Sequence, residues 1–163
     1  MKVTTMVLAT LLVGGLAPGV ASAQGGSPGA PDGQELAVDI RQATAQYHLL
    51  DKALADGYEA VTPCIEVPGV GGMGVHFLKP GLLDAITDPA QPEVLVYMPN
   101  KAGKYRLVAA EFLSTAEQAP VVDGIVFDAE VDPGAYSFTL HAWVWKHNPA
   151  GMYSAFNPAI GCP

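Results

Sequence analysis

The first regular pattern along the chain has the period of an α-helix. Apolar residues recur at steps of four and three, and polar residues fall largely between them. Gly57 follows the last apolar position and favours a left-handed stop. The pattern predicts one amphipathic helix over about residues 35–56, with these residues on its buried face: Leu36, Ile40, Ala43, Tyr47, Leu50 and Leu54.

Beyond this helix the pattern changes to short apolar runs separated by glycine and proline, which is typical of strands. Turn-forming residues at 101–104 and 132–134 predict tight connections between neighbouring strands. We therefore predict an α+β fold, in which the N-terminal amphipathic helix packs on an antiparallel sheet of about five or six strands. The candidate strands are Val61–Val67, Met73–Leu78, Glu93–Met98, Tyr105–Leu113, Ile125–Val131 and Ala135–Lys146.

The N-terminus has the pattern of a secretory signal peptide. Lys2 precedes an apolar run that is too short to span a bilayer comfortably, and Ala21-Ser22-Ala23 provides small residues for cleavage. A buried helix or a membrane anchor is the alternative. We expect residues 1–23 to be removed between Ala23 and Gln24, residues 24–34 to form a flexible linker, and residues 35–163 to form a single domain. The protein is then secreted, to the cell envelope or beyond, with no transmembrane segment after processing.

The charge of the chain argues against one class of partner. Lys and Arg number 8 against 16 Asp and Glu, which gives a formal net charge of −8. A protein this acidic, with no basic cluster, is a poor candidate for binding nucleic acid.

The chain contains two cysteines, Cys64 and Cys162. Because export leads to an oxidising compartment, an even cysteine count predicts a disulfide between them. A thiol nucleophile or a metal ligand is the alternative use of these residues.

Alternation along the predicted strands brings three titratable groups into apolar surroundings. His76 points away from Val75 and Phe77, and His141 points away from Leu140 and Ala142. Glu111 is the one charge in an apolar row that also contains Leu107, Ala109 and Leu113. Burying such groups is costly unless they are paired or bound to an ion.

Two imidazoles and one carboxylate suit a divalent metal such as zinc, copper or iron, and also a general acid–base pair. The structural alternatives are a buried hydrogen-bonded network or three separate surface positions. Glu66 is a lesser candidate for the same cluster, whereas Asp128 and Glu130 are interpreted as a solvated face.

Trp143 and Trp145 are predicted to share a face with His141. Aromatic residues on one face are most often core, and lining a ligand pocket is the functional alternative. We name these two residues as candidate ligand-binding residues.

Two familiar catalytic motifs are absent from the sequence. The glycine-rich run at 69–74 lacks the lysine of a phosphate-binding loop and precedes a strand, so it is interpreted as a turn that allows close backbone approach. No GxSxG elbow supports a serine hydrolase.

The segments "GMGVH" (72–76), "GKYRLVAAEFL" (103–113) and "HAWVWKHNPAGM" (141–152), with the late Cys162, resemble a family of uncharacterised exported bacterial proteins. The resemblance covers about residues 42–163 and implies no activity. The positions that carry it are Cys64, His76, Glu111, His141, Trp143, Trp145, Asn148, Met152, Asn157 and Cys162.

The leading functional hypothesis is an exported protein that binds a metal ion or a small ligand through His76, Glu111 and His141. A metal-assisted hydrolase or oxygenase that uses the same groups is the second hypothesis. The third is a structural or interaction module of the cell envelope, in which these residues are only core.

Overall fold

The computed structural model describes residues 32–130 and 134–163. The predicted signal peptide and most of the predicted linker, up to residue 31, lie outside the described residues. Asp32 and Gly33 form a turn, and the first helix begins at Gln34, one residue before its predicted start.

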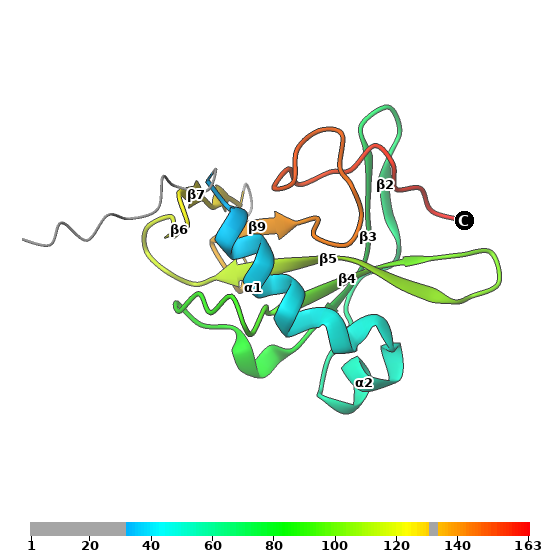
Figure 1. The fold of residues 1–163 in the computed structure, drawn as a ribbon, viewed down its shortest axis with the longest axis horizontal. Coiled ribbons are helices and arrows are strands. Elements are labelled where there is room, and N and C mark those ends of the chain that lie inside the picture. Colours follow the sequence, from blue (N-terminus) through cyan, green and yellow to red (C-terminus); the bar gives the residue numbers. More distant parts are fainter. Residues whose placement is uncertain (1–31, 131–133) are drawn as a thin grey trace, which may run out of the picture.

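A strongly curved antiparallel sheet dominates the described part of the chain (Figure 1). Seven strands belong to it, in the order β1-β3-β4-β5-β9-β8, and β2 pairs with the same β3. The α+β prediction is therefore confirmed. The strands are β1 (Glu59–Ala60), β2 (Ile65–Val67), β3 (Gly71–Leu78), β4 (Val94–Pro99), β5 (Tyr105–Ser114), β8 (Asp128–Ala129) and β9 (Phe138–Ala142), and a separate hairpin consists of β6 (Val121–Val122) and β7 (Ile125–Val126).

The prediction of one continuous helix over residues 35–56 is wrong, because the segment is interrupted. The segment divides into α1 (Gln34–Thr44), the 3-10 turn η1 (Ala45–His48) and α2 (Leu50–Ala55). Leu49 has an extended backbone between them, and the hydroxyl of Tyr97 donates to the carbonyl of Tyr47 just before this break. The break rotates the last turn, so Ala53 is buried and Leu54 is exposed. None of the helices in the described residues is long and apolar enough to cross a membrane.

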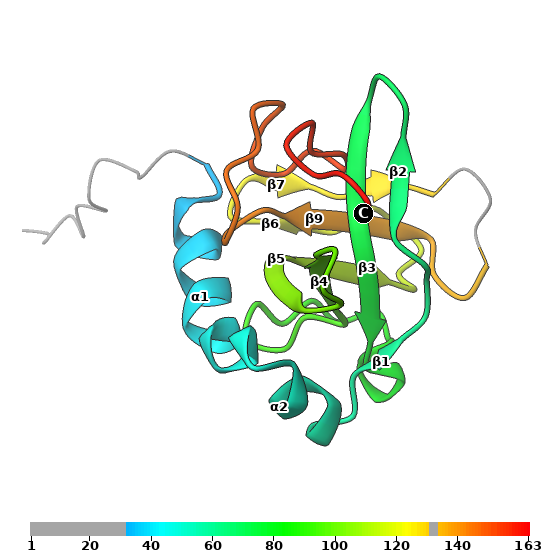
Figure 2. The ribbon, with the colours of Figure 1, turned by 90° about the vertical axis from the view of Figure 1, so that its right-hand side faces the viewer.

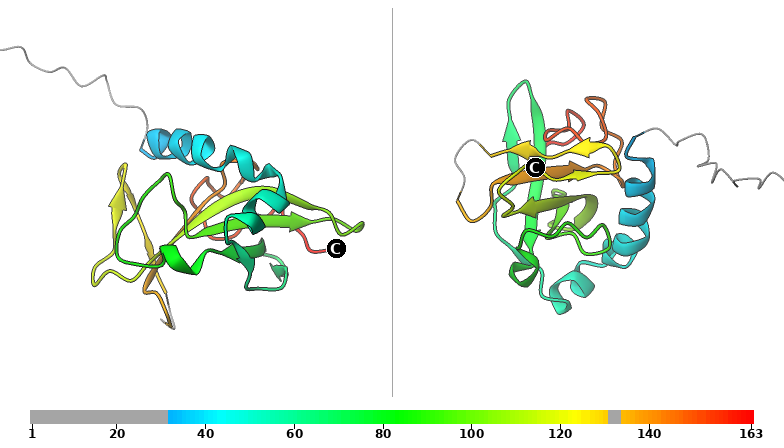
Figure 3. Two further views of the ribbon diagram at one scale, coloured as in Figure 1. Left: turned by 90° about the horizontal axis from the view of Figure 1, so that it is seen from below. Right: turned by 90° about the vertical axis from the view of Figure 1, so that its left-hand side faces the viewer.

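The helical segment covers one face of the sheet (Figure 3). Leu36, Ala37 and Ile40 of α1 pack with residues of β5 and β9, and η1 and α2 pack with residues of β3, β4 and β5. The opposite face has its own apolar cluster, which includes Val94 and Val96. This second face, away from the helices, carries the candidate site.

A bulge in β5 changes which residues share a face. Val96 pairs with Ala109 but Tyr97 pairs with Leu107, so Val108 is an extra residue and the strand bulges there. Leu107 therefore packs on the helix-covered face, and the prediction that it shares a face with Glu111 is wrong.

The C-terminal segment lies beside β3 (Figure 2). Gly72 bridges to Asn157 through backbone hydrogen bonds in both directions. A Cβ atom at Gly72 would lie 2.6 Å from the Ile160 side chain, so this close approach requires glycine. Cys64 and Cys162 form the predicted disulfide, which attaches the end of the chain to the segment before β2.

We expect the disulfide to contribute a large part of the free energy of unfolding. It joins residues that are 98 positions apart, and closing a loop of this size in the unfolded chain stabilises the fold by up to roughly 4–5 kcal/mol. Denaturant unfolding of the oxidised and the reduced protein measures this difference. The Cys64→Ser/Cys162→Ser variant is the control and should not respond to reductant. Equal unfolding midpoints for the oxidised and reduced wild type would contradict the prediction.

Candidate metal centre

Three neighbouring parts of the sheet supply the three predicted titratable groups. His76 belongs to β3, Glu111 to β5 and His141 to β9. Glu111 and His141 are direct cross-strand partners, whereas β4 separates His76 from Glu111. The two β4 residues on the path, Val94 and Val96, have short side chains, so the longer groups on either side can approach each other above them.

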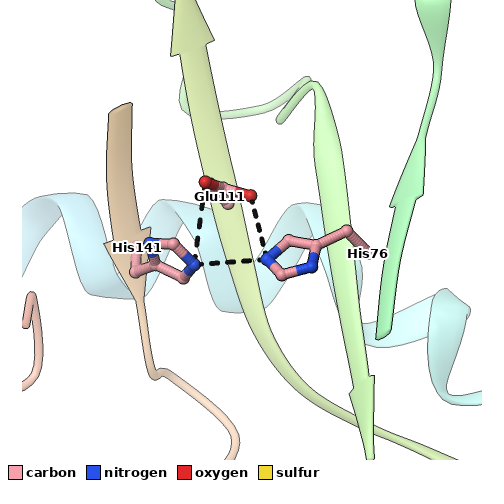
Figure 4. Close-up of side chains that lie close together, drawn as sticks. All are labelled: His76, Glu111 and His141. Atoms are coloured by element: carbon pink, nitrogen blue, oxygen red, sulfur yellow. Dashed lines mark hydrogen bonds and ion pairs between the residues drawn. The ribbon is translucent and has the colours of Figure 1, made fainter. Parts of the chain in front are cut away.

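The three side chains point toward one another on the face away from the helices (Figure 4). The Nε2 atoms of His76 and His141 are 3.4 Å apart. One carboxylate oxygen of Glu111 lies 3.4 Å from Nε2 of His76, and the other lies 3.6 Å from Nε2 of His141. The prediction that His76, Glu111 and His141 converge is thus confirmed in geometry.

These distances distinguish between two uses of the cluster. A hydrogen bond between such groups normally spans about 2.7–3.2 Å, so all three separations are long for a hydrogen-bonded network. Four ligands placed tetrahedrally at about 2.0–2.1 Å from an ion are roughly 3.3–3.4 Å apart, and octahedral neighbours are only about 2.9–3.0 Å apart. The 3.4 Å between the two Nε2 atoms is close to one edge of a tetrahedral metal site, and each imidazole faces its own oxygen of the Glu111 carboxylate.

Burial makes the cluster electrically neutral when no cation is bound. It raises the pKa of Glu111 to about 8, and the charges of Glu130 and Glu93 add to this rise. Burial lowers the pKa of His76 to about 4, and burial together with the nearby His76 lowers the pKa of His141 to about 3. At pH 7 the carboxyl group is therefore mostly protonated and both imidazoles are uncharged, so a bound cation would displace one proton.

Each imidazole is positioned by a different neighbour. The Thr62 hydroxyl accepts a hydrogen bond from the backbone N–H of His76 and lies 3.1 Å from its Nδ1 atom. The ring of His141 stacks on that of Trp143, with 15° between the two planes. Nδ1 of His141 is buried and has no hydrogen-bond partner among the described residues. Thr62 holds the ring of His76 with its Nε2 atom toward the cluster, as outer-shell partners of metal ligands do.

The triad opens into a cavity of about 400 Å³. Met73 and His76 both line the cavity, although a regular strand would place them on opposite faces. Gly74, between them, has a φ of 86° and interrupts the alternation. Asp128 and Glu130 also line the cavity, which corrects the prediction that they form only a solvated face. The cavity is completed by Val61, Thr62, Ile65, Leu78, Val94, Glu111, Leu113, Ala129, Tyr136, Thr139, His141, Ala155 and Phe156.

The two tryptophans, which were named as candidate ligand-binding residues, do not line this cavity. Trp143 is buried, packs in the cluster of the site face and donates from its indole N–H to the carbonyl of Ser154. Trp145 lies on the helix-covered face, where its indole N–H donates to Thr44 and its ring contacts His48. The alternation ends because β9 stops at Ala142 and the chain turns there. Both tryptophans line a separate surface depression.

Glu66, the lesser candidate, does not join the triad. Its carboxylate accepts a hydrogen bond from the backbone N–H of Cys162 and so helps to hold the C-terminal segment. Thr62 and Tyr136 line the site, yet no sequence pattern indicated either residue. Thr62 lies in an interruption between β1 and β2, and Tyr136 lies in the loop before β9, so their places depend on long-range packing.

Comparison with known proteins adds no family to this description. The chain matches no family model, no curated protein and no solved structure at a significant level. The resemblance to exported bacterial proteins therefore stays a prediction, and the functional argument depends on the geometry of the site.

The raised pKa of Glu111 makes the stability of the metal-free protein depend on pH. Its folded pKa of about 8 lies above the ordinary value of 4.5, so the stabilisation is complete below pH 4.5 and is lost as pH rises through 8. Between pH 7 and 8 we expect the free energy of unfolding to fall by up to about 1.4 kcal/mol. Denaturant unfolding in the presence of a chelator measures it.

The Glu111→Gln variant is the decisive comparison for this pH effect, because its amide cannot ionise. We expect its stability to fall less than that of the wild type between pH 7 and 8, where Glu93, whose pKa burial raises to about 7, still contributes, and to exceed that of the wild type at pH 8. Glu117→Gln is the matched control, since Glu117 is exposed and outside the cluster. If the wild type and Glu111→Gln lost the same stability over this interval, Glu111 would not be the group responsible.

Proposed function

We propose that this chain is an exported protein that binds one divalent transition-metal ion through His76, Glu111 and His141. The signal-like N-terminus and the disulfide between Cys64 and Cys162 support export to an oxidising compartment. The observation that carries the metal assignment is the convergence of two Nε2 atoms, 3.4 Å apart, on the two oxygens of one carboxylate, at 3.4 and 3.6 Å. Those separations suit an ion at the centre better than hydrogen bonds along the edges.

Zinc is the ion that this donor set favours most. Two imidazole nitrogens and a carboxylate are ordinary zinc ligands, and the 3.4 Å between the two Nε2 atoms is close to the edge of a tetrahedral site. Iron in a facial octahedral arrangement would bring the two Nε2 atoms to about 3.0 Å from each other. Copper also accepts imidazole, so metal content is the first measurement and zinc is the expected result.

A catalytic use of the metal is the second candidate function. Three protein ligands on one side of the ion would leave its remaining position directed to a cavity of about 400 Å³. This is the arrangement of catalytic zinc sites, in which a bound water occupies the open position and loses its proton near pH 7. Metal-dependent hydrolysis of an activated ester would favour this candidate over binding alone.

We expect the oxidised protein to bind about one equivalent of Zn²⁺ or Co²⁺. Each of the variants His76→Ala, Glu111→Gln and His141→Ala loses one ligand. Each should weaken metal binding by more than about 10- to 100-fold, which is the typical effect of losing an outer-shell partner. Calorimetric titration and elemental analysis measure the affinity and the stoichiometry. His147→Ala is the matched control, because His147 is an exposed histidine outside the triad. Metal binding that survives all three replacements would refute the assignment.

Thr62 gives a finer test of the same site, because it positions a ligand without being one. We expect Thr62→Val to weaken Zn²⁺ binding by about tenfold and Thr62→Ser to restore the affinity, since serine retains the hydroxyl next to Nδ1 of His76. The NMR signals of the His76 ring should shift in Thr62→Val and not in Thr62→Ser. Equal affinities for the three proteins would show that the hydroxyl does not orient the ring for metal binding.

A further inference from the structure

The cavity in front of the triad is much larger than a metal ion and its water require. Its volume is about 400 Å³, whereas one water takes up about 30 Å³ in the liquid, and sites for small molecules start at about 300 Å³. The space left beside a metal is therefore large enough for the body of a small organic ligand.

The walls of the cavity are mainly apolar. Strand residues on one side and loop residues on the other supply aliphatic and aromatic surface. Burying a ring or a branched alkyl group against such walls favours binding, because it removes apolar surface from water. The residues that supply this surface are Val61, Ile65, Met73, Leu78, Val94, Leu113, Ala129, Ala155 and Phe156.

The charged residues that line the cavity all have one sign. They are Asp128, Glu130 and, once a metal has displaced its proton, Glu111, and none of the described residues that line the cavity is a lysine or an arginine. Asp128 is exposed and Glu130 is half-buried, so both can act on a ligand that enters from solvent. A negative group on such a ligand would meet repulsion and no compensating cation apart from the metal itself.

We propose that the site binds a small apolar molecule that carries no negative charge and that coordinates the metal through a neutral nitrogen or oxygen donor. This proposal rests on the proposed metal-binding function, because the metal would anchor the donor end. The apolar walls would hold the body, and the acidic pair Asp128 and Glu130 would select against carboxylates and phosphates. The cavity thus specifies a class of ligand in addition to an ion.

The test uses the oxidised, Co²⁺-loaded protein, whose visible absorption reports on ligands that enter the coordination sphere. Imidazole, 4-phenylimidazole and benzoate are the probes. We expect 4-phenylimidazole to bind about tenfold or more tightly than imidazole, because its ring buries apolar surface. Ala155→Phe, which fills part of the cavity, should reduce this ratio. Equal affinities for imidazole and 4-phenylimidazole in the wild type would overturn the assignment of an apolar ligand.

The selection against anions is tested with a pair of charge-neutralising substitutions. Asp128→Asn/Glu130→Gln should strengthen benzoate binding about threefold, with little effect on the ratio between 4-phenylimidazole and imidazole. The control Asp51→Asn/Glu117→Gln removes the same charge from exposed positions outside the cavity and should leave benzoate binding unchanged. Unchanged benzoate affinity in the first variant would overturn the role of the acidic pair.

Failure of the ligand proposal can be told apart from failure of the metal site. Co²⁺ binding is measured before any probe is added, by titration of the metal-free protein. If Co²⁺ does not bind to the triad, the proposed function and this inference are both overturned. If Co²⁺ binds and the probes show no preference for an apolar body or a neutral donor, only this inference is overturned.

Discussion

The burial of Glu111 between two imidazoles is the constraint on which the rest of this structure depends. A carboxyl group and two histidines occupy the apolar face of a sheet, where each ionised form is destabilised by loss of water. The helices cannot cover this face, because they pack against the other one. Something else must shield the cluster from solvent, and the fold does this with the last part of the chain.

The C-terminal segment provides this cover, and several features hold it in place. Residues 155 and 156 line the cavity, Asn157 bridges to Gly72, and Cys162 is bonded to Cys64. Glycine is required at 72 because a side chain there would meet Ile160. The same disulfide lies two residues from Thr62, which orients His76. The cover of the site and the support of one ligand are therefore attached to each other covalently.

The sequence predicted the site better than it predicted the walls around it. Alternation identified His76, Glu111 and His141 as titratable groups in apolar strands, and the hypothesis that they meet held because each lies in a locally regular stretch of strand. It failed for Leu107, which lies beyond the bulge at Val108, and for Trp145, which lies beyond the end of β9. Bulges and strand ends arise from pairing with distant segments, and no period along the chain contains that information.

The same reasoning explains the partial success for the fold. The helix period was visible at α1, but the sequence did not show the break at Leu49. This break comes just after Tyr47, whose carbonyl accepts a hydrogen bond from Tyr97, about fifty positions away along the chain. Asp128 and Glu130 alternate with apolar residues, which is the pattern of a strand with one solvated face. The pairing of β8 with β9 nevertheless brings both of them to the cavity. Local pattern determined the type of each element, and long-range pairing determined which side chains reach the site.

The energetics of the cluster argue against a purely structural role. A buried ion pair or hydrogen-bonded pair adds little stability over an apolar replacement, and here the separations of 3.4–3.6 Å are too long for strong hydrogen bonds. Nδ1 of His141 is also unpaired among the described residues, which leaves a polar atom buried at a cost of about 1–3 kcal/mol. Apolar side chains would fill the same space at lower cost. In the proposed function, a divalent cation would take up the Nε2 lone pairs, which lack a strong hydrogen-bond donor, and would compensate the charge that Glu111 acquires when it loses its proton.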